Sequence, residues 1–472
     1  MDNENTSGQY VVAGVDTFVD LISKYIDKHD KSCHFTEESY ASFLSQTISK
    51  YLFSYGTGLS YKTKKISKNH RQKIAKSVHK IRERPFMKDT HLYMDSGGFQ
   101  VSMGAIETEN MPNFITEYHQ FLKDEKDNYK WGFCLDLPPG PGSEDIFDSY
   151  DQIESLNRLS YETSFNLPKD VKDKVIYIHH FRTPSLYKTW SKFLFEENLG
   201  EGYDYYGTGG IVANLSSDIT IPVIIYTIPL SSILRYIKSQ NRTSFKFHIL
   251  GGANFADVFY HKLFTHHIKK AHNVDVEITY DSSAIFKGLA IGRYIPVLQE
   301  NGNLVKMDLR SNNLHLQFDG DSINNKVYTI LNQMANKYGF KELNQETEPI
   351  YDPVPRGKSG AITFDRGVHM YLMAHILNTY RQMEILSDTV VENIYPMYQT
   401  GEIELFDQAC IDFTRKLNQG KCTRKQKAKT YSLYKSLKLL EDLDEDYNEY
   451  LVNKFMQSGD ISSMNGAGTI KF

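Results

Sequence analysis

Apolar positions along this chain follow two different spacings, which predict helices and strands in alternation. Near the start, apolar residues recur at helical spacing and predict an amphipathic helix: Phe18, Leu21, Ile22, Tyr25 and Ile26. From residue 91 onward, short runs rich in β-branched and aromatic residues are separated by longer polar stretches of helical character. These runs predict strands at His91–Asp95, Trp131–Asp136, Lys174–His180, Gly209–Ala213, Ile219–Ile228, Phe245–Leu250 and Val274–Asp281.

Alternating strands and helices are typical of a parallel sheet with crossover helices, and we expect a (β/α)8 TIM-type barrel. Several predicted strands end in a polar residue or a glycine pair, at Asp95, Asp136, Gly251 and Asp281. Catalytic groups of such barrels come from the ends of several strands at one face, which fits this recurrence. A doubly wound sheet is the alternative, and it is disfavoured because no GxGxxG motif opens a helix after a first strand.

The barrel is expected to span residues 91–340, between two other regions. Residues 1–90 are assigned to a helical and basic N-terminal extension integrated with the barrel. Residues 341–472 are assigned to a helical C-terminal region that follows a linker with Pro353, Pro355 and Gly357. Within it, Val368–Met383 and Asp388–Ile394 are predicted helices, with Pro396 ending the second.

Composition excludes collagen-like and wholly disordered chains, because hydrophobic residues make up 40% and charged residues 24%. The balance of 54 Lys and Arg against 58 Asp and Glu gives a net charge of −4, so any site for a polyanion must be local. Residues 61–90 hold such a surplus, with eleven Lys and Arg against two acids. This segment is either a solvated helix face or a nucleic-acid contact. Residues 413–440 are also basic, and they either pair with the acids of 441–449, which is the favoured interpretation, or contact nucleic acid.

Cysteine usage and apolar content bear on the compartment. Cys33, Cys134, Cys410 and Cys422 show no CxxC spacing, which argues against a disulfide scaffold and a zinc ribbon and favours a cytoplasmic protein. The first ten residues lack the features of a secretory signal. The longest apolar stretch is interrupted by two prolines and is shorter than a membrane span, so no membrane association is expected.

Two carboxylates at predicted strand ends, Asp95 and Asp281, are the first candidate site, because paired acids can flank and cleave a glycosidic bond. Taken singly, an aspartate after a strand is more often a cap or turn residue. The surrounding residues change that interpretation. The string Asp95-Ser96-Gly97-Gly98-Phe99-Gln100 resembles the signature of the tRNA-guanine transglycosylase family. Further similar segments follow in the same order: Cys134–Pro139, Gly209-Gly210-Ile211, His248–Ala253, and Tyr280–Ala284 with Gly292-Arg293-Tyr294.

The resemblance implies a base exchange through a covalent sugar intermediate. Asp281 would be the nucleophile at C1′, and Asp95 would protonate the departing guanine and deprotonate the incoming base. Asp136 would accept hydrogen bonds from N1–H and the 2-amino group of guanine. The remaining base-binding positions are Ser96, Phe99, Gly209, Gly210, His179 and Leu250, with Phe99 stacking on the base and Gly210 offering a backbone N–H. Nucleic-acid contacts are assigned to Lys62, Lys64, Lys65, Lys68, Arg71, Lys73 and Arg293.

The chain also departs from the family pattern. His179 stands where the family usually has a glutamine that contacts the base, and the pair His179-His180 leaves a metal site as an alternative. The family's zinc cluster is missing, because no cysteine lies between Cys134 and Cys410, and His375 alone cannot hold the ion. We therefore expect no metal and no cofactor.

These losses, together with the long N-terminal extension, point to the phage and bacterial DNA-guanine transglycosylases, which insert 7-deazaguanines into DNA. The expected partners are DNA and a 7-deazaguanine such as 7-cyano-7-deazaguanine, in the cytoplasm of the host if the protein is phage-encoded. Three alternatives remain open. They are a transglycosylase acting on tRNA, a non-catalytic nucleic-acid-binding paralogue, and a barrel enzyme acting on a small nucleoside.

Overall fold

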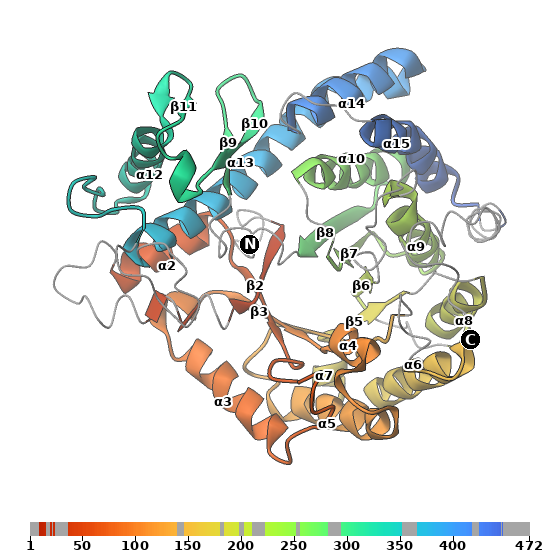
Figure 1. The fold of residues 1–472 in the computed structure, drawn as a ribbon. Helices are drawn as coiled ribbons and strands as arrows, with labels where there is room; N and C mark the ends of the chain where they lie inside the picture. The colour runs from red at the N-terminus through yellow and green to blue at the C-terminus, as the bar shows by residue number, and fades with distance from the viewer. Residues whose placement is uncertain are drawn as a thin grey trace.

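The computed structural model describes residues 9–15, 19–20, 22–23, 36–138, 146–179, 184–197, 203–209, 222–251, 255–281, 294–351, 366–417, 424–444 and 446. Eight parallel strands form a closed barrel in sequence order, with helices around it (Figure 1). The strands are β1 (Tyr10–Ala13), β2 (Lys50–Ser54), β3 (His91–Asp95), β4 (Trp131–Phe133), β5 (Val175–Ile178), β6 (Tyr205–Thr208), β7 (Ser244–Ile249) and β8 (Asp275–Asp281). The prediction of a (β/α)8 barrel is confirmed.

Helices follow the strands and cover the barrel. The α-helices are α2 (Glu37–Gln46), α3 (His70–Arg82), α4 (Gly98–Gln100), α5 (Met111–Asp124), α6 (Tyr150–Phe165), α7 (Lys169–Lys172), α8 (Pro184–Phe195), α9 (Pro222–Ser239), α10 (Phe255–His272), α12 (Ile323–Tyr338), α13 (Arg366–Gln399), α14 (Ile403–Leu417) and α15 (Arg424–Asp442). Short turns of other helix types are Pro85–Met87, Val101–Ala105, Thr108–Asn110 and Ser311–Asn313. No described helix combines the length and the apolar character that a membrane crossing requires.

Two of the eight strands come from residues 1–90, which the sequence analysis assigned to an extension of the barrel. β1 pairs with both β2 and β8, so it closes the barrel. Both strands are short, with four and five residues, and they carry too few residues for a clear alternation. The predicted opening helix lies largely outside the described residues, and residues 19–20 and 22–23 are helical.

The predicted strand at Ile219–Ile228 is wrong, because α9 begins at Pro222. An apolar run without polar interruptions fits a buried strand and a buried helix equally well. The side chains of α9 from Ile228 to Ile237 include several that are fully buried, which explains the uniformly apolar sequence. The strand predicted at Gly209–Ala213 lies outside the described residues except for Gly209. The sixth strand of the barrel, β6, precedes it and ends at Thr208.

Alternate residues of the strands face the inside of the barrel and form a core of their own. This inner cluster consists of Val11, Leu52, Tyr93, Phe133, Ile176, Ile178 and Tyr205. The residues between them pack outward on the helices in a much larger apolar core. Side chains two positions apart on one strand therefore share a face. This two-residue repeat determines which polar side chains near the strand ends face the inside of the barrel.

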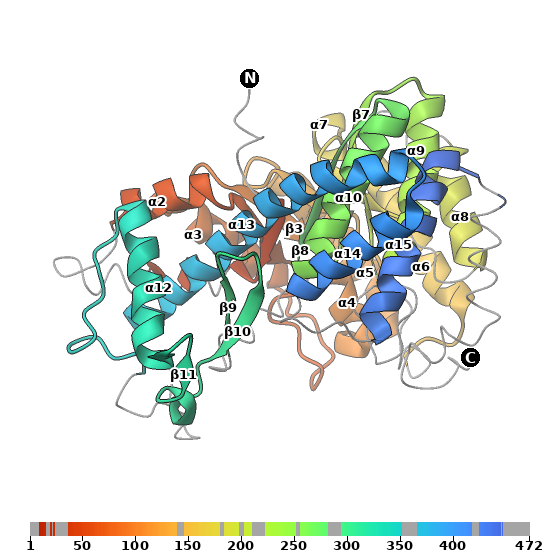
Figure 2. The ribbon, with the colours of Figure 1, turned by 90° about the horizontal axis from the view of Figure 1, so that it is seen from above.

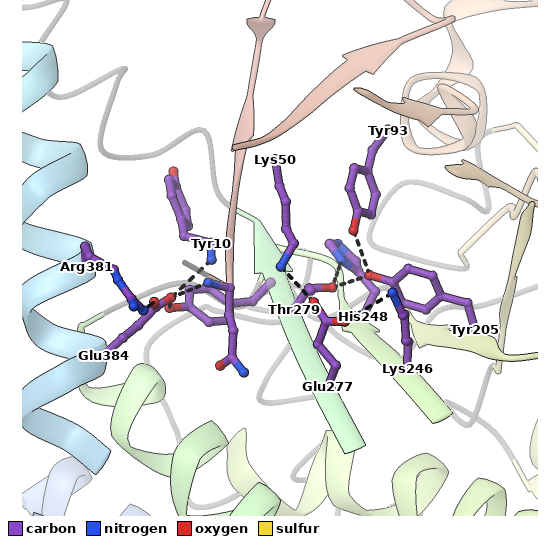
Figure 3. Close-up of polar contacts among 12 residues, drawn as sticks. Tyr10, Lys50, Tyr93, Tyr205, Lys246, His248, Glu277, Thr279, Arg381 and Glu384 are labelled. Atoms are coloured by element: carbon purple, nitrogen blue, oxygen red, sulfur yellow. Dashed lines mark hydrogen bonds and ion pairs between the residues drawn. The ribbon is translucent and has the colours of Figure 1, made fainter. Parts of the chain in front are cut away.

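The C-terminal region packs directly on the barrel instead of forming a separate unit. α13 is one helix where two were predicted, and Pro396 lies inside its last part. The buried carboxylate of Glu384 on α13 accepts hydrogen bonds from the backbone N–H of Gln9 (2.7 Å) and from the Tyr280 hydroxyl (2.8 Å) (Figure 3). α13 thus stabilises the seam between β1 and β8.

Two small antiparallel pairs follow the barrel strands in sequence and lie outside the barrel, where the first of them contacts α13. They are β9 (Tyr294–Leu298) with β10 (Leu304–Asp308), and β11 (Gln317–Phe318) with β12 (Asp321–Ser322). Together with α12 they lie at one side of the barrel, as Figure 2 shows. The amino-terminal and carboxyl-terminal parts of the chain therefore both contribute to the surroundings of a single barrel.

Candidate active site

Asp95 and Asp281 lie at the carboxyl ends of β3 and β8, at the same mouth of the barrel. Burial is the main cause that raises the pKa of Asp95 above its usual value, and the charge of Asp281 raises it further. Hydrogen bonds from the Ser54 hydroxyl and from two backbone N–H groups act in the opposite direction and do not cancel the effect. A carboxyl group whose pKa is raised can exist as an acid closer to neutral pH, as a general acid must.

Asp281 is almost fully buried, at 8% exposure. Its Oδ1 accepts a hydrogen bond from the backbone N–H of Gly251 at 2.8 Å and lies 3.3 Å from Nε2 of His248. Gly251 and His248 belong to β7 and the turn after it, so the neighbouring strand orients the carboxylate. The backbone N–H, together with Nε2 of His248 in the tautomer that carries a proton there, holds the carboxyl group in a single orientation.

The glycines of the Asp95–Gln100 motif allow three loops to pack together. Gly97 has a φ of +77°, and a Cβ there would lie 2.6 Å from the backbone of Gly56 in the loop after β2. A Cβ on Gly98 would lie only 1.7 Å from the carbonyl oxygen of Asp136 in the loop after β4. Any larger residue would separate these loops, so the glycine pair is required by the fold of the mouth.

Asp136 lies beside the residues predicted to contact the base with it. A Cβ built on Gly209 would lie 2.9 Å from Oδ2 of Asp136 and 3.3 Å from Cδ1 of Leu250. The Asp136 loop is fixed from α6, because Asn157 donates to the carbonyl oxygen of Leu137 (3.1 Å) and accepts from its N–H (2.7 Å). The loops after β4, β6 and β7 therefore bring an acid, a bare backbone and an apolar side chain together.

The other residues of the first motif differ in exposure. The ring of Phe99 is 46% exposed on α4, so it is open to a ligand at the mouth. Ser96 is fully buried, and its hydroxyl accepts a hydrogen bond from the N–H of Gly98 at 3.2 Å. Ser96 thus shapes the loop. Gly210 and Arg293 lie outside the described residues.

His179 does not join this group. Its ring is fully buried, with Nε2 3.1 Å from the Ser191 hydroxyl, and it stacks on Phe195 at 5.8 Å between ring centroids. Both neighbours belong to α8, whereas the preceding residue, Ile178, faces the inside of the barrel. The structure therefore places His179 between a strand and a helix, away from Asp136, and the prediction that it contacts the base is not supported by its position.

The sequence analysis missed a polar chain beneath the two acids. Nδ1 of His248 lies 2.8 Å from the Thr279 hydroxyl, which lies 2.5 Å from the hydroxyl of Tyr205. Tyr205 in turn lies 3.3 Å from the hydroxyl of Tyr93, and Figure 3 shows the four side chains meeting inside the barrel. The signal was present, because His248 and Thr279 stand two residues before Leu250 and Asp281 and so share their inward face.

The basic segment divides into two parts. Lys62, Lys64, Lys65 and Lys68 are exposed in the loop between β2 and α3, at the same end of the strands as Asp95. No ion pair is found for these four among the described residues. Four basic residues of α3 have partners: Arg71 lies 3.6 Å from Glu117, Lys73 donates to Ser67, Lys80 pairs with Asp20 at 2.7 Å, and Arg82 donates to three carbonyl groups.

A cleft of about 690 Å³ lies beside this loop. Its lining includes Lys65, Lys68 and Arg71 together with the acids Glu107 and Glu117. Because the lining carries both signs of charge, the cleft is not a uniformly positive site.

Metal ligands do not gather in the part of the chain that the structure describes, where no group of three or more His, Cys, Asp or Glu is close enough to hold an ion. His375 lies on α13 with Nε2 2.7 Å from the carbonyl oxygen of Pro296, and burial lowers its pKa. His180, Cys33 and Cys422 lie outside the described residues.

Comparison with known proteins adds no assignment. No family model matches the sequence, and no curated protein matches it. What the barrel mouth can do must therefore be argued from its own geometry.

Proposed function

We propose that this protein is a base-exchange transglycosylase that replaces guanine in DNA with a 7-deazaguanine through a covalent glycosyl-aspartate intermediate. The observation that carries the proposal is the unlike environment of two carboxyl groups at one barrel mouth. Asp281 is held as an acceptor by two donors, whereas burial and the charge of Asp281 raise the pKa of Asp95. Carboxyl groups with such divergent environments divide the roles of nucleophile and acid/base.

In the first step, an oxygen of Asp281 attacks C1′ of the target nucleotide. The bond from this oxygen to C1′ forms while the bond from C1′ to N9 of guanine breaks, and its electron pair moves to the base. Asp95 donates its proton to the departing guanine. The product is a sugar ester of Asp281 with the polymer backbone intact.

In the second step, the base that enters is deprotonated at N9 by Asp95, which is now a carboxylate. N9 attacks C1′, and the ester oxygen of Asp281 leaves with its electron pair. Asp95 is again an acid, so the enzyme returns to its starting protonation state after one exchange.

The space beside Asp136 suits a flat base with two adjacent donors. Its carboxylate would accept N1–H and the 2-amino group of guanine, a donor pair that adenine lacks. Gly209 leaves room for the ring, and Leu250 covers one face of it. A 7-deazaguanine retains both donors, so the same residues would bind the outgoing and the incoming base.

A polymer substrate is supported by the position of the four exposed lysines. Lys62, Lys64, Lys65 and Lys68 follow β2 and so lie at the mouth that holds Asp95. Exposed cations at the entrance neutralise backbone phosphates, and the target guanine must leave its stack to reach the acids. Unstacking costs a few kcal/mol in a duplex, so single-stranded or opened DNA is expected to react faster than closed duplex.

Label transfer tests the proposal directly. The protein is incubated with labelled 7-cyano-7-deazaguanine and with single-stranded DNA, duplex DNA or tRNA, and the label in each polymer is counted. Label in DNA that is abolished by Asp281→Ala supports the proposal. Label in tRNA alone would replace it with a tRNA-guanine transglycosylase, and label in no polymer would leave the binding paralogue and the nucleoside enzyme as the remaining functions.

A further inference from the structure

We propose that His248 is a positioning residue that reserves Oδ2 of Asp281 for attack by binding Oδ1, and that it does so in either of its charge states. This inference rests on the proposed function of the same site. It concerns which oxygen reacts, and which of the two chemical steps depends most on the residues around that oxygen.

Among the described residues, the two groups that lie within hydrogen-bond distance of the Asp281 carboxylate both contact one oxygen. The Gly251 N–H donates to Oδ1 at 2.8 Å, and Nε2 of His248 lies 3.3 Å from the same atom. Hydrogen bonds draw electron density onto Oδ1 and weaken it as a nucleophile, which leaves Oδ2 as the oxygen that bonds to C1′. In the ester, Oδ1 becomes the carbonyl oxygen and keeps both donors.

The second step gains most from this arrangement. When the incoming base attacks C1′, the bond to Oδ2 breaks and negative charge returns to the carboxylate of Asp281. Donors fixed on Oδ1 stabilise that charge as it develops, and they bind the neutral ester more weakly. His248 is therefore expected to accelerate breakdown of the intermediate more than its formation.

The polar chain below His248 lets the ring donate to Asp281 in two protonation states. In one state Tyr205 donates to Thr279 and Thr279 donates to Nδ1, so His248 is neutral with its proton on Nε2. If the hydroxyl groups all rotate, Thr279 donates to Tyr205 and accepts from Nδ1–H, so His248 is an imidazolium. The hydrogen bonds that link Tyr205, Thr279, His248 and Asp281 are made in both states, and Nε2–H faces Oδ1 in each. In the second state the hydroxyl of Tyr205 can donate to Tyr93.

The neighbours of His248 add no competing donor. The ring of Phe133 lies 4.8 Å from the His248 ring, and Tyr93 covers it at 6.3 Å. On the helical side lies His261, where burial, with the charge of His248 as a smaller cause, lowers the pKa to about 3. His261 is therefore neutral when the enzyme works, and the acids Asp281, Asp95 and Asp136 are the ionisable groups that the described residues place at the ends of the strands.

Single-turnover kinetics test the proposal. The enzyme is mixed with labelled DNA, the covalent adduct is quantified on denaturing gels, and its decay is timed after addition of 7-cyano-7-deazaguanine. His248→Phe should slow adduct formation by about 10-fold and adduct decay by about 100-fold, so that adduct accumulates. His248→Gln keeps an N–H donor and should recover most of the decay rate. Lys246→Gln, two residues away on the same strand, is the matched control and should decay at the parental rate.

Parental adduct decay in His248→Phe, or no recovery in His248→Gln, would overturn the proposal. Thr279→Val removes the partner of Nδ1 and should slow adduct decay less than His248→Phe does. This variant serves as the test if His248→Phe does not fold. Ring 15N NMR of the parent reads the hydrogen bond without any turnover. Nε2 should carry a proton across the working pH range, and a proton on Nδ1 alone would refute the inference even if exchange were observed. Absence of adduct in the parent with Nε2 protonated would instead count against the proposed function.

Discussion

The pKa of a carboxyl group is shifted in opposite directions at the mouth and at the other end of the barrel. At the other end, which we call the floor, Glu277 of β8 lies 2.7 Å from Lys50 and 3.3 Å from Lys246 (Figure 3). Burial by itself would raise the pKa of Glu277, but the charges of the two lysines outweigh it and hold the pKa below its usual value. At the mouth, four residues further along the same strand, Asp281 faces another acid, and the pKa of Asp95 is raised.

This contrast separates stability from reactivity within single strands. β8 carries Glu277 at one end and Asp281 at the other, and β7 carries Lys246 and His248 in the same order. Charges at the floor are paired and fix the barrel, whereas the acids at the mouth are kept near one another at a cost in stability. One strand geometry therefore offers two environments to a carboxyl group, and they differ in the charge of its neighbours.

The largest expected effect comes from removing the nucleophile. Asp281→Ala should reduce base exchange by about 10⁵ or more, because the whole covalent route is lost. Glu277→Gln is the matched change at the floor and should leave the exchange rate within about threefold of the parent if the protein remains folded. Label incorporation into DNA measures both variants. Near-parental exchange in Asp281→Ala would contradict the assignment of the mouth as the reactive end.

Base recognition should follow with a smaller loss. Asp136→Asn replaces one acceptor by a donor, and exchange with guanine or 7-deazaguanine should fall by about 10³ to 10⁴. Gly209→Ala places a methyl group 2.9 Å from Oδ2 of Asp136 and should raise the KM for the free base without changing the melting temperature. Equilibrium binding of the free base provides the measurement. If Asp136→Asn bound the base as tightly as the parent, the base would be read elsewhere.

Charges at the rim of the mouth should act on affinity and its salt dependence. Lys65→Ala with Lys68→Ala removes two exposed cations and should weaken DNA binding about 10-fold while lowering the slope of log K against log salt by about 2. Lys76→Ala with Lys80→Ala removes the same charge from α3, further from the mouth, and should leave that slope unchanged. Fluorescence anisotropy at several salt concentrations distinguishes the pairs. Equal effects of both pairs would mean that net charge alone matters.

Removal of the carboxylate at the floor should lower the stability of the protein. Glu277→Gln leaves two lysines without their carboxylate and is expected to lower the free energy of unfolding by about 2 kcal/mol at pH 7, less than for a fully buried pair because Glu277 is partly exposed. Since the pKa of Glu277 is lowered in the folded state, its contribution is present above its unfolded pKa and is lost as the pH falls through the folded value. Urea unfolding should therefore show the difference at pH 7 and little of it in acid. A constant difference at every pH would indicate packing instead of charge.

Asp95→Asn should have the smallest effect on stability and the opposite sign. Because the pKa of Asp95 is raised on folding, the folded parent binds more protons and loses stability as the pH rises from its unfolded pKa to its folded one. The amide has no such loss, so the variant should be the more stable protein at neutral pH even though its exchange is impaired. Thermal melting across pH 3 to pH 8, taken as a rough working range for a carboxyl group, tests this. A variant that is less stable than the parent at neutral pH would show that the carboxylate is structurally required.

Much of the barrel was predictable because strand signals are local. β3, β4, β5, β7 and β8 were predicted within a few residues, since each carries its own alternation and its own polar end. The convergence of Asp136, Gly209 and Leu250 was expected from the resemblance to the transglycosylase family, which implied that all three contact the base. β1, β2 and the start of α9 were not, because a short apolar run does not distinguish a strand from a buried helix.

The sequence by itself determined which residues stand at strand ends, because period and turn chemistry depend only on near neighbours along the chain. Only the tertiary structure decided what each of them faces. Closure of the barrel directs His179 toward α8, brings His248 to Asp281, and sets Glu384 beside Gln9, 375 positions away in sequence. Such contacts follow from the packing of distant segments around one core. Hydrophobic burial drives that packing, and because it is not directional, a local sequence pattern does not specify which segments pack together.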